Sequence, residues 1–197
     1  MSYGPEPLVP LRFDLSRLVR RSVASLYSHL VTRPTGQALR LGIESQIGET
    51  GAVCLSVLDF GQVAVLDYSC ADEAVAKLIL RYQRDDRPAD AYFLARGVGE
   101  RHRETIEAVL ARYGLALVIE ENGGGATLIG EVSAIERAVW TALEELRQAD
   151  AARIAERIAA AESDVASALD SLTRRRVLLR RERPRAFVAL SGVAPAG

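Results

Sequence analysis

Short apolar runs alternate with helix-like segments between residues 52 and 129, and this alternation restricts the fold more than any other feature. Residues 52–60 are almost continuously apolar, which is typical of a strand covered on both faces. Residues 71–82 and 100–113 carry apolar side chains at the spacing of one helix face. Further strands are expected over residues 63–66, 91–95, 115–119 and 126–129. The pattern predicts an α/β fold in which helices pack on a sheet.

The regions on either side are organised differently. Residues 1–10 contain three prolines and are expected to form a flexible tail. An amphipathic helix is expected over residues 15–30, ending before Pro34, and a second over residues 37–47. The third part is expected to contain helices over residues 133–148, 151–160 and 163–175 and a hairpin with strands near 177–179 and 186–190. We therefore expect a tail over 1–10, an α/β domain over 11–130 and a second domain over 131–197.

Composition is that of an ordinary globular protein. The chain has 197 residues, is 49% hydrophobic and carries a net charge of −1, so no overall field attracts nucleic acid or membrane. Lys77 is the only lysine, and every other cation is arginine. Cys54 and Cys70 lie in apolar surroundings without a C-x-x-C spacing and are expected to be reduced thiols. The first residues do not read as a signal peptide, and no apolar run approaches the roughly 20 residues of a membrane span. We expect a cytoplasmic protein.

The segment from Leu58 to Asp72, LDFGQVAVLDYSCAD, resembles the signature of STAS domains, the anti-sigma factor antagonist family. The order of elements over about residues 52–130 is similar too. The resemblance implies a protein-binding switch whose partner kinase phosphorylates the position of Ser69. It implies a regulatory protein partner and makes the edge that carries Asp67, Tyr68 and Asp72 the candidate contact surface.

Ser69 has a second interpretation that needs no function. It precedes a helix and is followed three residues later by Asp72, which is the spacing of a capping box. A phosphate at Ser69 would face the same helix N-terminus, which favours anions. Tyr68 and Cys70 depart from the family pattern, and Asp72 and Glu73 would repel a phosphate. Capping is therefore the simpler interpretation of Ser69, and phosphorylation the alternative.

Residues 133–190 resemble a winged helix-turn-helix, with residues 163–172 in the place of the recognition helix. That resemblance implies DNA contacts from Ser167 and from an arginine cluster at the helix end and wing. The cluster consists of Arg174, Arg175, Arg176, Arg180, Arg181, Arg183 and Arg185. Asp164 and Asp170 on the same helix oppose contact with a polyanion. The arginines and the aspartates of this region therefore leave two interpretations open: the C-terminal domain contacts DNA, or it contacts only protein.

No group of residues indicates catalysis, a cofactor or a metal. The glycines at 123–125 lack the context of a phosphate loop, and His29 and His102 lack a second ligand at metal spacing. We expect a non-enzymatic regulatory protein that acts in transcription, binds a protein partner, and contacts DNA or a second copy. One alternative is a pure protein-binding scaffold or dimerisation module without DNA contact. Another is an enzyme or small-nucleotide binder that uses the cleft near Ser69 and the glycine turn.

Overall fold

A five-stranded sheet lies at the centre of the protein. The structure is a computed structural model that describes residues 9–14, 29–50, 53–121, 123–182 and 185–193. The strands of this sheet are, in spatial order, β1 (Val9–Asp14), β3 (Cys54–Asp59), β5 (Ala91–Arg96), β6 (Ala116–Glu120) and β7 (Ala126–Gly130). The first four run parallel, and β7 pairs antiparallel with β6. The mixed α/β class predicted from the sequence is confirmed.

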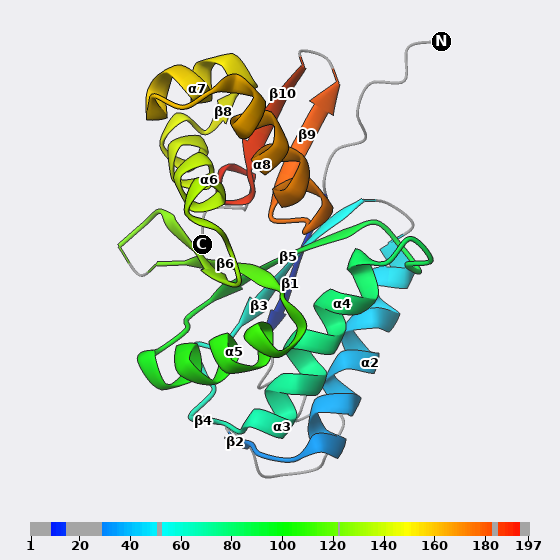
Figure 1. The fold of residues 1–197 in the computed structure, drawn as a ribbon. Helices are drawn as coiled ribbons and strands as arrows, with labels where there is room; N and C mark the ends of the chain where they lie inside the picture. The colour runs from blue at the N-terminus through cyan, green and yellow to red at the C-terminus, as the bar shows by residue number, and fades with distance from the viewer. Residues whose placement is uncertain (1–8, 15–28, 51–52, 122, 183–184, 194–197) are drawn as a thin grey trace.

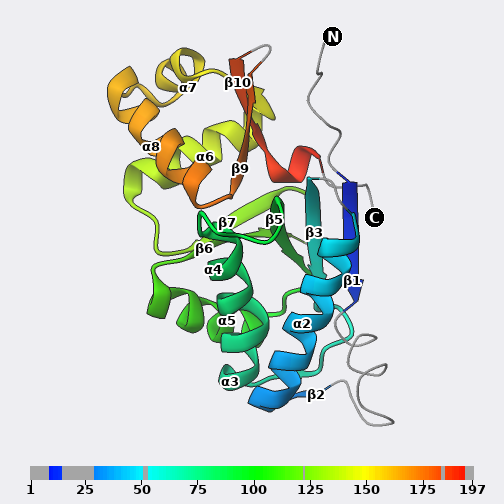
Figure 2. The same ribbon diagram turned by 90° about the vertical axis from the view of Figure 1, so that its right-hand side faces the viewer.

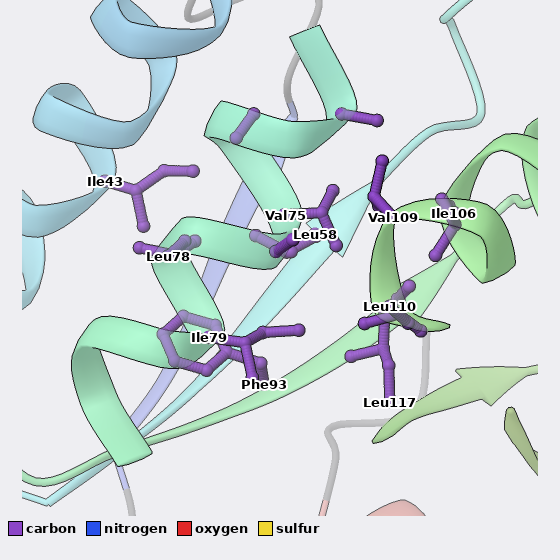
Figure 3. Packing of buried hydrophobic residues seen from close by; sticks show 14 of the residues in the cluster. Ile43, Leu58, Val75, Leu78, Ile79, Phe93, Ile106, Val109, Leu110 and Leu117 are labelled. Atoms are coloured by element: carbon purple, nitrogen blue, oxygen red, sulfur yellow. The ribbon is translucent and has the colours of Figure 1, made fainter. Parts of the chain in front are cut away.

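Three helices cover one face of this sheet (Figure 1). They are α2 (Arg33–Thr50), α5 (Glu100–Tyr113) and a continuous helix from Tyr68 to Gln83. The continuous helix comprises α3 (Tyr68–Ala71), a π-helical segment (Asp72–Lys77) and α4 (Leu78–Gln83). Figure 3 shows Ile43, Val75 and Ile106 from these helices packing in one apolar layer with side chains of the sheet. The helices connect successive parallel strands, which is why their apolar faces meet the same side of the sheet.

A short parallel ladder lies beside the main sheet. It pairs β2 (His29–Leu30) with β4 (Val65–Leu66). Leu30 and Leu66 are buried in the apolar layer beneath the helices. This ladder places the start of the Tyr68–Gln83 helix at one end of the molecule.

The C-terminal unit, residues 134–193 as described, covers the other face of the sheet (Figures 1 and 2). It contains α6 (Ala134–Leu146), α7 (Ala151–Ile158) and α8 (Glu162–Arg174). An antiparallel sheet in the order β8 (Gln148–Ala149), β10 (Arg185–Ala189), β9 (Leu178–Glu182) completes it, with a 3₁₀ turn at Leu190–Gly192. Leu55 and Val57 of β3 belong to the same buried cluster as Trp140 and Leu143 of α6. The C-terminal unit and the main sheet therefore share one apolar core.

Several expected boundaries differ from the structure. β1 begins at Val9, so the last two residues of the expected tail belong to the sheet, and residues 1–8 lie outside the described part. Residues 15–28 of the expected first helix also lie outside it, and its last two residues form β2 instead. The helix expected from residue 37 begins at Arg33, because Pro34 is tolerated in a first turn. Gln148, expected to end a helix, belongs to β8.

Among the described residues, no helix combines the length and the apolar character that crossing a bilayer requires.

Candidate functional site

Asp67 begins the Tyr68–Gln83 helix. Its backbone N–H donates to the Leu30 carbonyl at 2.8 Å, which ties this turn to β2. Its Oδ1 accepts hydrogen bonds from the Ser69 N–H at 2.7 Å and from the Ser69 hydroxyl at 2.5 Å. The bond from the Ser69 hydroxyl is the main reason that the pKa of Asp67 lies below its usual value. Asp67 is therefore the N-cap of the helix.

The predicted capping box of Ser69 and Asp72 is wrong. Ser69 lies inside the first turn, where its hydroxyl donates to Asp67 instead of accepting from the backbone. Asp67, two residues earlier, has the extended backbone of a cap and reaches the Ser69 N–H directly. Ser69 is half-buried, and its phosphorylation stays a prediction. A phosphate there would add negative charge beside the Asp67 carboxylate.

Tyr68 lies at the surface beside these two residues, with 40% of its area exposed. Val65 on β4 and Val31, directly after β2, are also exposed apolar side chains at this end of the molecule. A hydrogen bond with the Tyr68 side chain is the main cause of the raised pKa of Arg112, so Arg112 borders the same surface. We call Val31, Val65, Tyr68 and Arg112 the Tyr68 surface. It combines apolar area, an aromatic ring and a cation, which suits contact with a protein.

Asp72 does not belong to that surface. Only 1% of its area is exposed, and it forms a buried acidic pair with Glu73. Arg33 Nη1 lies 3.0 Å from Asp72 Oδ2 and 2.7 Å from Glu73 Oε1, and Lys77 Nζ lies 2.5 Å from Glu73 Oε1. The hydroxyl of Tyr113 donates to Asp72 Oδ1 at 2.8 Å. The expectation that Asp72 takes part in partner contact is therefore corrected, because its carboxylate is enclosed by groups of this chain.

The ionised form of the acidic pair is favoured despite burial. Burial raises the pKa of Asp72, but hydrogen bonds from Tyr113 and Arg33 and the nearby charge of Lys77 outweigh it, and the pKa lies below its usual value. The pKa of Glu73 is lowered against burial in the same way, with Lys77 and Arg33 as its main donors. Both carboxylates are therefore charged members of the fold at neutral pH.

The π-helical segment allows both carboxylates to share one set of cations. Asp72 and Lys77 are five residues apart and lie within 3.4 Å of each other. In an α-helix such residues point about 140° apart, whereas π-helical hydrogen bonds join residues i and i+5 and bring them together. Lys77 thus reaches Asp72 and Glu73 at once.

The arginine cluster of the C-terminal unit divides into two groups. Arg174, Arg180, Arg181 and Arg185 are exposed at the end of α8 and on the β9–β10 hairpin, and Arg183 lies outside the described residues. Arg180 lies 4.0 Å from Asp170, and Arg181 donates to the Gln148 side chain at 3.1 Å. These are contacts of exposed side chains, which water screens strongly. The four described arginines remain accessible to a ligand.

Arg175 and Arg176 form the other group, and both are half-buried against the α/β part. Arg175 donates to the Glu131 carbonyl, and its own carbonyl accepts from the Gln83 side chain at 2.8 Å. Arg176 donates to the Ala91 carbonyl at 2.7 Å, and its side chain is only 11% exposed. Both join the C-terminal unit to the α/β part. The Arg176 guanidinium is held by its contacts with β5 and Asp90 and is not offered to a ligand, whereas DNA contact by Arg175 stays a prediction.

The outer face of α8 carries few cations. Ser163, Asp164, Ser167 and Asp170 are exposed there, as expected for the resembled recognition helix. The Ser167 hydroxyl donates to the Ser163 carbonyl at 2.9 Å, which leaves its oxygen free to accept. Ser171, near the end of the helix, is half-buried and donates to Glu136 at 2.6 Å.

Sequence reasoning missed several residues that hold the candidate sites in place. Gln83 and Tyr92 contact the C-terminal unit, and Arg33 contacts the acidic pair, but no sequence signal identifies such distant partners. Glu136 was detectable. It forms a capping box with Ser133, and the spacing of these two residues is the known signature of that motif.

The described residues contain no group of three or more His, Cys, Asp and Glu side chains arranged to hold a metal ion. Gly124 and Gly125 adopt positive φ values of 85° and 84° in the hairpin between β6 and β7. Only glycine takes such values readily, which explains the glycine run as a turn.

In comparisons with known proteins, no protein-family model matches the chain, and no curated protein sequence matches it.

Proposed function

We propose that this chain is a non-catalytic regulatory protein with two contact surfaces. The α/β part, which resembles a STAS domain, binds a protein partner through the Tyr68 surface. The C-terminal unit, which resembles a winged helix, binds DNA through its exposed arginines. Transcriptional regulation is the role that such a combination serves.

The accessibility of Arg174, Arg180, Arg181 and Arg185 carries this proposal. Arg174 lies at the end of α8, and Arg180, Arg181 and Arg185 lie on the hairpin, while Arg175 and Arg176 contact the α/β part. A patch of guanidinium groups neutralises DNA phosphates and releases counterions. The element order of the C-terminal unit adds support, since three helices and a hairpin are what the resemblance implies.

Salt-dependent binding to duplex DNA tests the proposal. We expect the full chain to shift random-sequence duplexes at low salt, with an affinity that falls as salt rises. The double variant Arg180→Gln/Arg181→Gln should weaken binding and reduce the slope of log K against log salt by about 1 for each arginine that contacts a phosphate. The control Arg84→Gln/Arg101→Gln removes the same charge from exposed positions of the α/β part and should bind as the unaltered chain does.

The second candidate function is a protein-binding scaffold without DNA contact. Glu162, Asp164 and Asp170 on the exposed side of α8 favour it, because they would repel phosphates in a groove. No DNA shift at low salt would favour the scaffold over the DNA-binding protein. An equal loss in both double variants would show that DNA binding does not depend on the hairpin arginines.

A further inference from the structure

We propose that the Tyr68–Gln83 helix couples the Tyr68 surface to the position of α8 and the hairpin. A partner bound at the Tyr68 surface would then alter the C-terminal unit without touching it. The inference deepens the proposed function, since it specifies how the two contact surfaces communicate.

One uninterrupted helix joins the two places. The residues at its internal junctions, Ala71 (φ −61°, ψ −39°) and Lys77 (φ −69°, ψ −30°), keep right-handed helical backbone. Its first turn is capped by Asp67 and carries Tyr68. Its last turn ends at Gln83, beside the C-terminal end of α8, and Figure 1 shows α3 and α4 at opposite ends of this rod. While the helix keeps its hydrogen-bond register, a displacement along its axis at one end therefore appears at the other.

The last turn of the helix contacts the segment that follows α8. Gln83 Nε2 donates to the Arg175 carbonyl at 2.8 Å. Ile79, Tyr82 and Gln83 also line a small cavity with Arg175, Arg176 and Val177. The buried Tyr82 hydroxyl has no hydrogen-bond partner among the described residues. This contact thus leaves a small cavity and one unbonded buried hydroxyl, Tyr82.

The segment after α8 is a tight turn held at both its backbone and a side chain. Arg176 has φ 58°, the left-handed conformation common directly after a helix end, and its N–H and that of Val177 donate to the Thr173 and Leu172 carbonyls at 3.0 and 3.2 Å. The Arg176 guanidinium contacts β5. A small movement of Gln83 would change the position of this turn relative to β5.

The π-helical segment supplies two registers. A π-helical turn contains one residue more than the matching α-helical turn, so converting it to α-helix moves one end of the rod by about 1.5 Å relative to the other. The shared contacts of Arg33 and Lys77 with Asp72 and Glu73 favour the π register. A partner that pulls on the Asp67–Tyr68 turn acts against those contacts.

Hydrogen–deuterium exchange of the full chain tests the coupling without any partner or DNA. Asp67→Ala removes the cap, and we expect amide exchange in the last turn of α8 and residues 175–177 to rise about fivefold, the effect of losing an N-cap. Exchange in β6 should stay constant, which separates coupling from global unfolding. The matched control is Thr32→Ala. It removes a hydrogen bond at the start of α2, where the Thr32 hydroxyl accepts from the Thr35 N–H at 3.3 Å, and it should leave amide exchange in α8 unchanged.

A double variant identifies Gln83 as the link. In Asp67→Ala/Gln83→Ala, exchange after α8 should equal that of Gln83→Ala alone. The coupling would be overturned if Asp67→Ala raised exchange only in residues 68–71. It would also be overturned if Asp67→Ala raised exchange after α8 by the same factor with Gln83 present and with Gln83→Ala. Asp67→Asn serves the same comparison if Asp67→Ala does not fold. Absence of DNA binding by the unaltered chain would overturn the proposed DNA output but leave the exchange result decisive for the coupling.

Discussion

The guanidinium carbon of Arg176 lies 4.2 Å from the centre of the Tyr92 ring, which joins the end of α8 to β5. The same side chain donates to the Ala91 carbonyl and pairs with Asp90. A planar guanidinium can stack and donate at once, whereas an ammonium group cannot. The Arg176 side chain thus contacts three consecutive residues, Asp90, Ala91 and Tyr92, at the start of β5.

We expect Arg176→Ala to lower the free energy of unfolding by about 2–3 kcal/mol, because it removes the stacking, a hydrogen bond and an ion pair together. Arg176→Lys should recover less than half of that loss, since it restores only the charge. Urea denaturation followed by tryptophan fluorescence measures both, because Trp140 lies in the buried cluster of the C-terminal unit. The exposed neighbour Arg174 is the control, and its replacement by Ala should change stability by less than about 0.5 kcal/mol. Similar losses for the two alanine variants would contradict the role given to Arg176.

Gly36 on α2 should not tolerate a side chain. A Cβ atom at this position would lie 2.6 Å from the Cys70 carbonyl oxygen, closer than real Cβ contacts. Gly36→Ala must push α2 away from α3, and we expect a loss of about 1–3 kcal/mol. Gly48 on the same helix has open space around it, so Gly48→Ala should stabilise the protein by about 0.5–1 kcal/mol. Thermal unfolding of the two variants gives shifts of opposite sign, and a stabilised Gly36→Ala would show that the two helices do not pack this closely.

Local patterns were enough to predict most of the main sheet and its helices. The helix predicted over residues 100–113 has those bounds, because its apolar face and Gly114, with φ 63°, define it locally. β1 was missed because Pro10 belongs to a proline-rich start, although Val9, Leu11 and Phe13 alternate as in a strand. Its extended conformation depends on pairing with β3, a contact that the local sequence does not contain.

The candidate sites were predicted less well, for two physical reasons. Asp67 and Ser69 could each have capped the helix, and only the backbone path from β4 decides that Asp67 does. The consecutive arginines Arg174, Arg175 and Arg176 look alike in the sequence. The approach of β5 and α4 from far along the chain is what half-buries Arg175 and Arg176 and leaves Arg174 exposed.

His102 should make stability depend on pH near neutrality. Burial lowers the pKa of His102 below 6.5, and a hydrogen bond with the Ala64 backbone offsets only part of that effect. The folded state therefore favours the neutral ring. The stability gained is fully present above the unfolded-state pKa and is lost as pH falls through the lower folded-state pKa. We expect unfolding free energy to decline from about pH 7 towards pH 5, and His102→Gln to reduce that decline. The control His29→Gln, which replaces the other histidine, should show the same decline in unfolding free energy as the unaltered chain. An unchanged decline in His102→Gln would mean that His102 is not its cause.

Asp72→Asn should weaken the buried ion cluster. The variant leaves Arg33 and Lys77 with a single carboxylate, Glu73, and we expect a loss of about 2–4 kcal/mol at pH 7. Because the folded-state pKa of Asp72 is lowered, its contribution is present above the unfolded value near pH 3.9 and disappears as pH falls through the folded-state pKa. The difference between the unaltered chain and Asp72→Asn should therefore shrink below about pH 4.

Tyr113 provides the test that this loss comes from the cluster itself. Tyr113→Phe removes the hydroxyl that donates to Asp72, and we expect it to cost about 0.5–1.5 kcal/mol. The loss of stability in Asp72→Asn/Tyr113→Phe should be smaller than the sum of the losses in the two single variants, because both substitutions remove the same interaction. Full additivity in a double-mutant cycle would mean that Tyr113 stabilises the fold independently of the Asp72 charge. In that case the ionised form of Asp72 would depend on its cations Arg33, Lys77 and Arg112.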